Sequence, residues 1–287
     1  MLYLITTASR QTATDGTLSR LLDSIEPQSG AVRLYLLLQQ NEDSAAQNLM
    51  ARYHFVRATA IEGMVSLSKA RNIALGMLAQ DGPSPDDLIG FPDDDAWLYP
   101  GFVDRLQAEI QAEEGWISGS YSDAEDRTNP RFPAQEAALE PELILRCLSS
   151  ITFFVRWQYL QQVGGFDERL GVGTNLGSSE DIDMGLRLWR AGARGRYVCP
   201  LVMGHRVDSP SEGETQQQER PQYWSGSIAV FIKHLTILPR PHRMIAGRLR
   251  RGLYLVRNGH LSAIGFLRIL LQAVALPFRT QKTQKPD

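Results

Sequence analysis

Short apolar runs alternate with segments of helical spacing over the first hundred residues. Val32–Leu38 is an apolar run except for Arg33, which is typical of a strand covered on both faces. Within Leu18–Ile25 the apolar residues recur at the spacing of one helix face. The predicted strands are residues 2–7, 32–38, 54–56 and 87–91, and the predicted helices are 18–25 and 66–78. This alternation predicts an α/β fold with a mostly parallel sheet and helices on both faces.

The alternation becomes less regular from Gly115 onward. The predicted strands there are residues 116–121, 151–155 and 197–203, and the predicted helices are 134–147, 157–163 and 180–191. Three further helices are expected in residues 223–278, separated by Pro239 and Pro241 and then by Asn258-Gly259. The apolar stretch 261–278 is long enough to cross a membrane, but Arg268 and Gln272 interrupt it.

Charge is distributed unevenly along the 287 residues. Of the 30 Lys and Arg and 32 Asp and Glu, residues 220–287 hold 12 basic residues and one acid, leaving 18 and 31 upstream. Arg243, Arg250 and Arg257 recur every seven residues and therefore share one helix face. A basic amphipathic helix predicts association with an anionic membrane surface. The alternative is a helix packed on the acidic body, and no aromatic interleaving or motif supports nucleic acid binding.

The cysteine count and the N-terminus both favour a cytoplasmic protein. Cys147 and Cys199 are too few for a disulfide framework. The opening residues MLYLITTASR lack the basic start, apolar core and cleavage site of a signal peptide. Together with the basic tail, these features predict a peripheral location on the inner face of the cell membrane.

Three adjacent aspartates, Asp93, Asp94 and Asp95, follow the predicted strand 87–91. Ligands of such sheets bind at the carboxyl ends of the strands, so the aspartates lie where a ligand is expected. Their mutual repulsion would be relieved by a hard divalent cation, since Mg²⁺ and Mn²⁺ prefer oxygen ligands. The alternative for this run is a solvated acidic loop.

A second acidic group, Glu180, Asp181 and Asp183, opens the predicted helix 180–191. Acids in a first helical turn are explained by the helix dipole alone. The Gly-rich segment 171–177 before them, however, is typical of a loop that places carboxylates in a cleft. His205 directly follows a strand, and a histidine among carboxylates can complete a metal site, although a lone histidine is more often structural.

In combination these segments resemble the family 2 glycosyltransferases. Residues 67–75 are similar to that family's Ala-Arg-Asn helix, and Ile89–Asp95 with Pro100 downstream is similar to its metal-binding aspartate motif. Its acceptor-side motif is matched by residues 163–168, 180–183 and 187–192, and His205 stands where the family has a histidine. The four motifs occur in the family's order, and the resemblance covers residues 1–207.

The resemblance implies a GT-A fold, a nucleoside-diphosphate sugar donor, a divalent metal (Mn²⁺ or Mg²⁺) and inversion at the anomeric centre. It implies Asp181 as the general base, with Glu180 holding that base or the acceptor. The implied metal ligands are Asp93, Asp95 and His205. The residues expected to bind the donor are Thr6, Arg10, Glu42, Lys69, Arg71, Asp93 and Asp94.

The chain departs from the family pattern in two places. Where the family has an Asp that contacts the base, the second strand ends in residues 38–43, in which either Glu42 or Asp43 could serve. Residues 217–221 resemble the Gln-x-x-Arg-Trp motif of processive members but lack its Trp, which favours the addition of one sugar per encounter.

Two other function classes are less consistent with the sequence. A sugar nucleotidyltransferase would open with a Gly-rich phosphate loop, and residues 6–10 are not one. A non-catalytic scaffold would be expected to have lost Asp95 or Asp181, and both are present. We therefore expect a catalytic domain in residues 1–210, with a nucleotide-sugar half (1–99) and an acceptor half (100–210), followed by a basic helical tail (211–287). The predicted acceptor is a lipid-linked or polysaccharide precursor.

Overall fold

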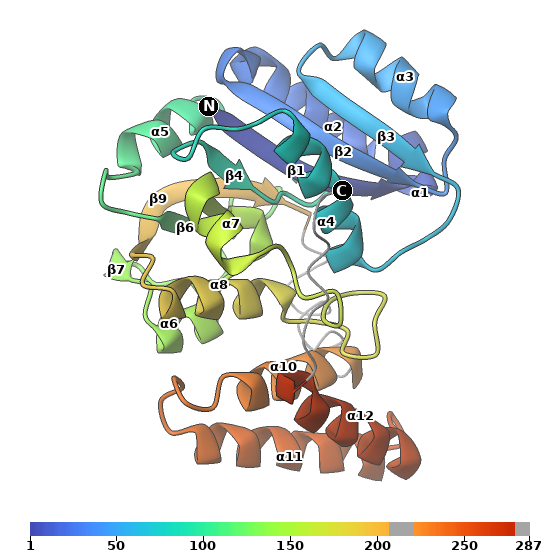
Figure 1. Ribbon diagram of the computed structural model, residues 1–287, viewed down its shortest axis with the longest axis vertical. Coiled ribbons are helices and arrows are strands. Elements are labelled where there is room, and N and C mark those ends of the chain that lie inside the picture. Colours follow the sequence, from blue (N-terminus) through green and yellow to red (C-terminus); the bar gives the residue numbers. More distant parts are fainter. Residues whose placement is uncertain (207–220, 279–287) are drawn as a thin grey trace.

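A computed structural model describes residues 1–206 and 221–278 of the chain. In these residues, nine strands form one mixed sheet flanked by helices (Figure 1). The strands are β1 (Leu2–Ser9), β2 (Val32–Gln39), β3 (Val56–Ile61), β4 (Leu88–Gly90), β5 (Ala96–Trp97), β6 (Trp116–Ser122), β7 (Ala137–Ala138), β8 (Phe153–Arg156) and β9 (Gly195–His205). Eight of them follow the order β3-β2-β1-β4-β8-β6-β9-β5, and β7 pairs with β9 outside this path.

The N-terminal half of the sheet is parallel, as the apolar pattern predicts. β1 pairs in parallel with both β2 and β4, and β2 pairs in parallel with β3. β8 then runs antiparallel between β4 and β6. Because parallel strands end at the same edge, the loops that follow β1, β2 and β4 lie at that edge.

Helices cover both faces of the sheet. The helices of the body are α1 (Arg10–Thr14), α2 (Thr17–Ile25), α3 (Asp43–Arg52), α4 (Leu67–Gln80), α5 (Phe102–Glu109), α6 (Pro141–Cys147), α7 (Trp157–Val163) and α8 (Glu180–Arg190). One buried apolar cluster joins the sheet to α2, α3 and α5, and a second joins it to α4, α6, α7 and α8. The α/β fold with helices on both faces is thus confirmed.

Two predicted elements are wrong in position. The helix predicted from Ala134 begins only at Pro141, which occupies its first turn, because Ala137 and Ala138 pair with β9 instead. The strand predicted at residues 54–56 begins only at Val56 and continues to Ile61. Tyr53 and Phe55 are buried there without belonging to the strand. Their apolar character therefore placed the predicted start of the strand too early in the sequence.

The C-terminal helices are α10 (Pro221–Lys233), α11 (Pro241–Arg257) and α12 (Ala263–Ala275), which confirms the three helices expected in this region. They form the end of the molecule opposite the sheet (Figure 1). Trp224, Ile228 and Leu255 of these helices belong to the same buried cluster as α8. Within the described residues, every helix is too short or too polar to cross a bilayer. The Gln217–Arg220 part of the family motif lies outside the described residues.

Candidate active site

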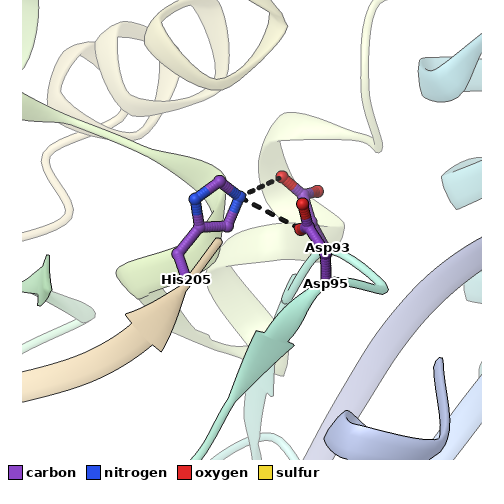
Figure 2. Close-up of side chains that lie close together, drawn as sticks. All are labelled: Asp93, Asp95 and His205. Carbon is purple, nitrogen blue, oxygen red and sulfur yellow. Dashed lines mark ion pairs between the residues drawn. The ribbon is translucent and has the colours of Figure 1, made fainter. Parts of the chain in front are cut away.

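Asp93, Asp95 and His205 come together at the edge of the sheet (Figure 2). Ala96 pairs with His205 across β5 and β9, so the sheet register itself places Asp95 beside the imidazole. His205 Nε2 lies 3.1 Å from Asp95 Oδ1 and 3.9 Å from Asp93 Oδ2. One ligand atom from each of the three residues lies within 4.8 Å of the others. The predicted metal ligands are therefore close enough to bind one ion.

The chemistry of this group suits a divalent cation. Burial lowers the pKa of His205, but the hydrogen bond with Asp95 and the charges of Asp95 and Asp93 outweigh it and raise the pKa. A bound cation would take the place of that proton between the imidazole and the carboxylates. Two carboxylate oxygens and one imidazole nitrogen suit Mn²⁺ or Mg²⁺, and they leave coordination positions for phosphate oxygens.

Asp94 has a different environment from its two neighbours. Burial raises its pKa to about 6, a hydrogen bond with Thr12 opposes the rise, and the charges of Asp93 and Asp95 add to it. The repulsion expected among three adjacent aspartates is therefore present here. Asp94 is not one of the three residues of the metal group.

Arg71 connects the metal group to the acids of α8. Its side chain is only 2% exposed, and Nη2 donates to Asp93 Oδ1 at 2.7 Å and to Ser150 Oγ at 3.0 Å. Nη1 lies 3.4 Å from Glu180 Oε1. The guanidinium thus holds two carboxylates from motifs that are 87 positions apart in the sequence. Such a buried charge is stable only when it is paired in this way.

The next residue of α4, Asn72, fixes the loop before α8. Asn72 Oδ1 accepts from the Phe166 backbone N–H at 2.8 Å, and its Nδ2 donates to the Phe166 carbonyl oxygen at 2.9 Å. A Cβ at Gly165 would lie 2.4 Å from Asn72 Oδ1, so only glycine allows this approach. The Ala-Arg-Asn and Gly-Gly-Phe-Asp segments therefore form one interlocked unit.

Glu180 and Asp181 occupy the first turn of α8. Asp181 Oδ2 accepts from the Ser150 N–H at 3.3 Å, and its Oδ1 accepts from the Ile182 N–H at 2.8 Å. Burial and the Asp181 charge raise the pKa of Glu180 to about 7, while Arg71 opposes the rise. Burial also raises the pKa of Asp181, against its backbone hydrogen bonds and Arg71. Asp181 is half-buried and Glu180 is buried, so Asp181 is the more exposed of the two.

Asp183 belongs to a different cluster, although it lies only two residues away. Its side chain is fully buried, and Oδ1 contacts Lys233 Nζ at 2.7 Å and His234 Nε2 at 2.8 Å. Arg187 Nε donates to its Oδ2 at 2.8 Å. Asp167 accepts from the same Lys233 at 2.8 Å. These contacts join α8 to α10, so Asp183 has a structural role.

Lys69 and Arg71 lie on different sides of α4. Arg71 is buried against the carboxylates, whereas Lys69 is exposed and lines a cavity of about 640 Å³. The other lining residues are Val65, Ser66, Glu168, Arg169, Gly173, Thr174, Asn175, Leu176, Gln272 and Leu276. None of the acids of the metal and base groups lines this cavity. The structure therefore does not bring Lys69 together with Arg71.

Three other residues expected to bind the donor lie near the carboxyl ends of β1 and β2. Thr6 Oγ1 is buried and donates to the Pro92 carbonyl oxygen at 3.0 Å, which ties β1 to the aspartate loop. Arg10 Nε donates to the Gln40 carbonyl oxygen at 2.6 Å. Glu42 is exposed and precedes α3. They share this edge of the sheet with Asp93.

Two residues near the site were not anticipated from the sequence. Ser150 bonds both Arg71 and Asp181 from a short 3-10 turn, and a single serine gives no distinctive sequence pattern. The Arg131 guanidinium lies 5.2 Å and 4.9 Å from the Tyr121 and Phe132 ring centroids. Its charge opposes the rise in the pKa values of both Asp181 and His205. Arg131 is therefore a cation that acts on both parts of the site.

No protein-family model matches the chain, and no curated protein is significantly similar to it in sequence. Solved structures do match. TarS residues 1–349 from S. aureus in complex with UDP-GlcNAc gives a TM-score of 0.67 at 15% identity, covering 96% of this chain and 81% of that one. A mannosyltransferase, PcManGT from Pyrobaculum calidifontis in complex with GDP-Man and Mn²⁺, gives 0.56 at 13% identity, covering 98% and 76%.

These likenesses show that the chain has the GT-A fold. GalNAc-T7 with UDP, GalNAc and Mn²⁺ is a further match, with a TM-score of 0.53 at 11% identity, covering 90% of this chain and 56% of that one. The fold class expected from the sequence is thereby confirmed.

Proposed function

We propose that this protein is an inverting glycosyltransferase that uses a nucleoside-diphosphate sugar and a divalent metal, Mn²⁺ or Mg²⁺. The observation that carries the proposal is the linked pair of acidic groups in a GT-A fold. Asp93, Asp95 and His205 lie on one side, Glu180 and Asp181 lie on the other, and Arg71 bridges them. Similar structures contain UDP-GlcNAc or GDP-Man with Mn²⁺, which supports this donor class.

The two groups have separate tasks in the reaction. Asp93, Asp95 and His205 would hold the cation, which stabilises the charge of the nucleoside-diphosphate leaving group. Asp181 would accept the proton of the acceptor hydroxyl as that oxygen attacks the anomeric carbon. Arg71 positions Asp93 and Glu180 so that both groups keep their places. Direct displacement with a single base supports inversion at the anomeric centre. The acceptor class that we propose is a lipid-linked or polysaccharide precursor.

Donor hydrolysis gives a direct test of metal and donor together. The purified protein should release nucleoside diphosphate slowly from at least one of a set of nucleotide sugars with Mn²⁺, and not with EDTA. Asp95→Ala should reduce this release at least about 100-fold, because the leaving-group charge loses its cation. Nucleoside diphosphate with Mn²⁺ should raise the melting temperature of the wild type but not of this variant.

Asp86→Ala is the matched control, because Asp86 is an exposed acid whose side chain is 76% accessible. It should retain wild-type hydrolysis. Failure of every nucleotide sugar to be hydrolysed or to stabilise the protein would contradict the proposed donor class. An Asp95→Ala variant that kept its metal-dependent melting shift would place the metal elsewhere.

The raised pKa values at the base group predict a pH dependence. The base acts only when ionised, and burial raises the pKa values of both Glu180 and Asp181, that of Glu180 to about 7. At saturating metal, kcat/KM should therefore begin to fall on acidification at a higher pH than it would with an unperturbed aspartate, whose pKa is about 4. Glu180→Gln removes one charge of the pair, so it should move the acid limb to lower pH. A profile that stayed flat from pH 5.5 to 8 would exclude a titrating base of this kind.

A further inference from the structure

Exposed apolar side chains are concentrated on the last two helices. Among residues 1–206 and 221–278, ten large hydrophobic side chains are exposed, and six of them lie on α11 and α12. The six are Leu253, Tyr254, Ile264, Leu267, Leu271 and Val274. Ile264 is 82% exposed and Leu271 is 64% exposed. A concentration of this kind marks an interaction surface, since single exposed apolar residues are usually scattered.

The exposed side chains of α12 form a regular row. Positions 264, 267, 271 and 274 follow the spacing of one helix face. The opposite face is already used, because Phe266 stacks on Trp224 of α10 at 5.2 Å and Ala273 is fully buried. The helix is therefore apolar on two sides, and packing within this chain explains only one of them.

The same end of the molecule is strongly basic. Residues 221–278 contain eight Lys and Arg and no Asp or Glu. Arg243, Arg250 and Arg257 are all exposed, so the arginine face predicted for α11 is at the surface. Met244 and Leu249 instead pack against the buried core. The apolar contribution to the surface thus comes from the end of α11 and from α12, which the arginine spacing alone did not indicate.

We propose that this surface, the exposed face of α11 and α12, docks on an anionic lipid bilayer. A row of protruding aliphatic side chains flanked by arginines matches a helix that lies in the headgroup region. Exposed arginines are attracted to anionic lipid headgroups. Helices α11 and α12 contain no Asp or Glu that would oppose this attraction. A second copy of the chain fits poorly, because a two-fold contact would bring the same basic surface against itself.

Docking would also bring a cavity close to the lipid. Gln272 and Leu276, at the C-terminal end of this helical segment, line the cavity of about 640 Å³ together with Thr174 and Asn175. The cavity and the docking surface are therefore separated by about the width of one helix, roughly 10 Å. If the proposed function is correct, this arrangement suits an acceptor carried by a lipid. The docking itself does not depend on that function.

Vesicle binding tests the proposal with the full-length protein. At low salt it should sediment with vesicles of phosphatidylcholine and phosphatidylglycerol but hardly with phosphatidylcholine alone, and added salt should release it. Replacing Arg243, Arg250 and Arg257 with Gln should weaken binding roughly 100-fold. Replacing Ile264, Leu267 and Leu271 with Ser should weaken it about tenfold or more, since the insertion of apolar side chains is lost.

The matched control removes three exposed arginines of the body, Arg57, Arg105 and Arg190, by replacement with Gln. It should bind vesicles like the wild type, and all three variants should keep the wild-type melting temperature and donor hydrolysis. An equal loss of binding in the control would show that net charge, and not this surface, is responsible. Wild-type protein that ignores the anionic vesicles overturns the proposal. Self-association that the Ser variant abolishes, without vesicle binding, would assign the surface to a second copy.

Discussion

Asp181→Asn should lower kcat for glycosyl transfer by about 10²–10⁴-fold while leaving donor binding nearly unchanged. The amide has almost the shape of the carboxylate but cannot accept the proton of the acceptor hydroxyl. Asp181 is not part of the Asp93, Asp95 and His205 group, so the metal and the donor should still bind. Steady-state kinetics with the donor and acceptor, together with the melting shift caused by nucleoside diphosphate and Mn²⁺, would separate the two effects.

Asp104→Asn is a suitable control for this experiment. Asp104 is also an acid in the first turn of a helix, α5, but it is exposed and lies outside the site. Its replacement tests whether the loss of a favourable helix-dipole interaction alone changes the rate. Near wild-type transfer by Asp181→Asn would exclude Asp181 as the base, and Glu180 would then be the residue to test. A parallel loss of donor binding would indicate that the substitution disturbs Arg71 and its partners.

The sheet was predictable because its pattern is local. The apolar run of β2 and the helical spacing in α2 and α4 are each explained by burial on one or two faces. The wrong predictions lie where pairing with a strand distant in the sequence decides the conformation. Ala137 and Ala138 favour a helix by composition, but they pair with a strand about 60 positions further on. Local propensity is a weak guide when tertiary contacts compete with it.

The same distinction applies to the site. The family resemblance implied Asp93, Asp95 and His205 together as metal ligands, but the two-residue strand β5 that brings Asp95 beside the imidazole has no sequence pattern of its own. The bridging role of Arg71 depends on burial between Asp93 and Glu180, which local spacing cannot show. The sequence indicated residue types suited to a metal and a base. The geometry that links them comes from the packing of α4 against β1 and β2.

Helical geometry also divides the acids of α8 into two kinds. Each residue turns the side chain by about 100°, so Asp183 points away from the direction of Asp181. Its partners lie about 50 positions downstream: Lys233 is the last residue of α10, and His234 directly follows that helix. No local pattern connects residues at that separation. An acidic helix start can therefore contain both a carboxylate that we propose as the base and a structural one.

Asp183→Asn should reduce the free energy of unfolding by about 3–5 kcal/mol. The carboxylate is fully buried and accepts from Lys233, His234 and Arg187. An amide would leave Arg187 without its carboxylate partner and Lys233 with Asp167 alone. Urea denaturation of the wild type and the variant at pH 7 measures the loss. Asp86→Asn, which affects an exposed ion pair with Arg156, is the comparison and should cost no more than about 1 kcal/mol.

The pH dependence of stability distinguishes this charge cluster from a general packing defect. Burial would raise the pKa of Asp183, but Arg187, His234 and Lys233 together hold it well below its usual range. A lowered pKa in the folded state stabilises the protein above the unfolded pKa of about 4, and that stabilisation is lost as the pH falls further. The wild type should therefore lose stability on acidification more steeply than Asp183→Asn. Equal pH slopes in the two proteins would show that Asp183 contributes by shape and packing instead of by charge.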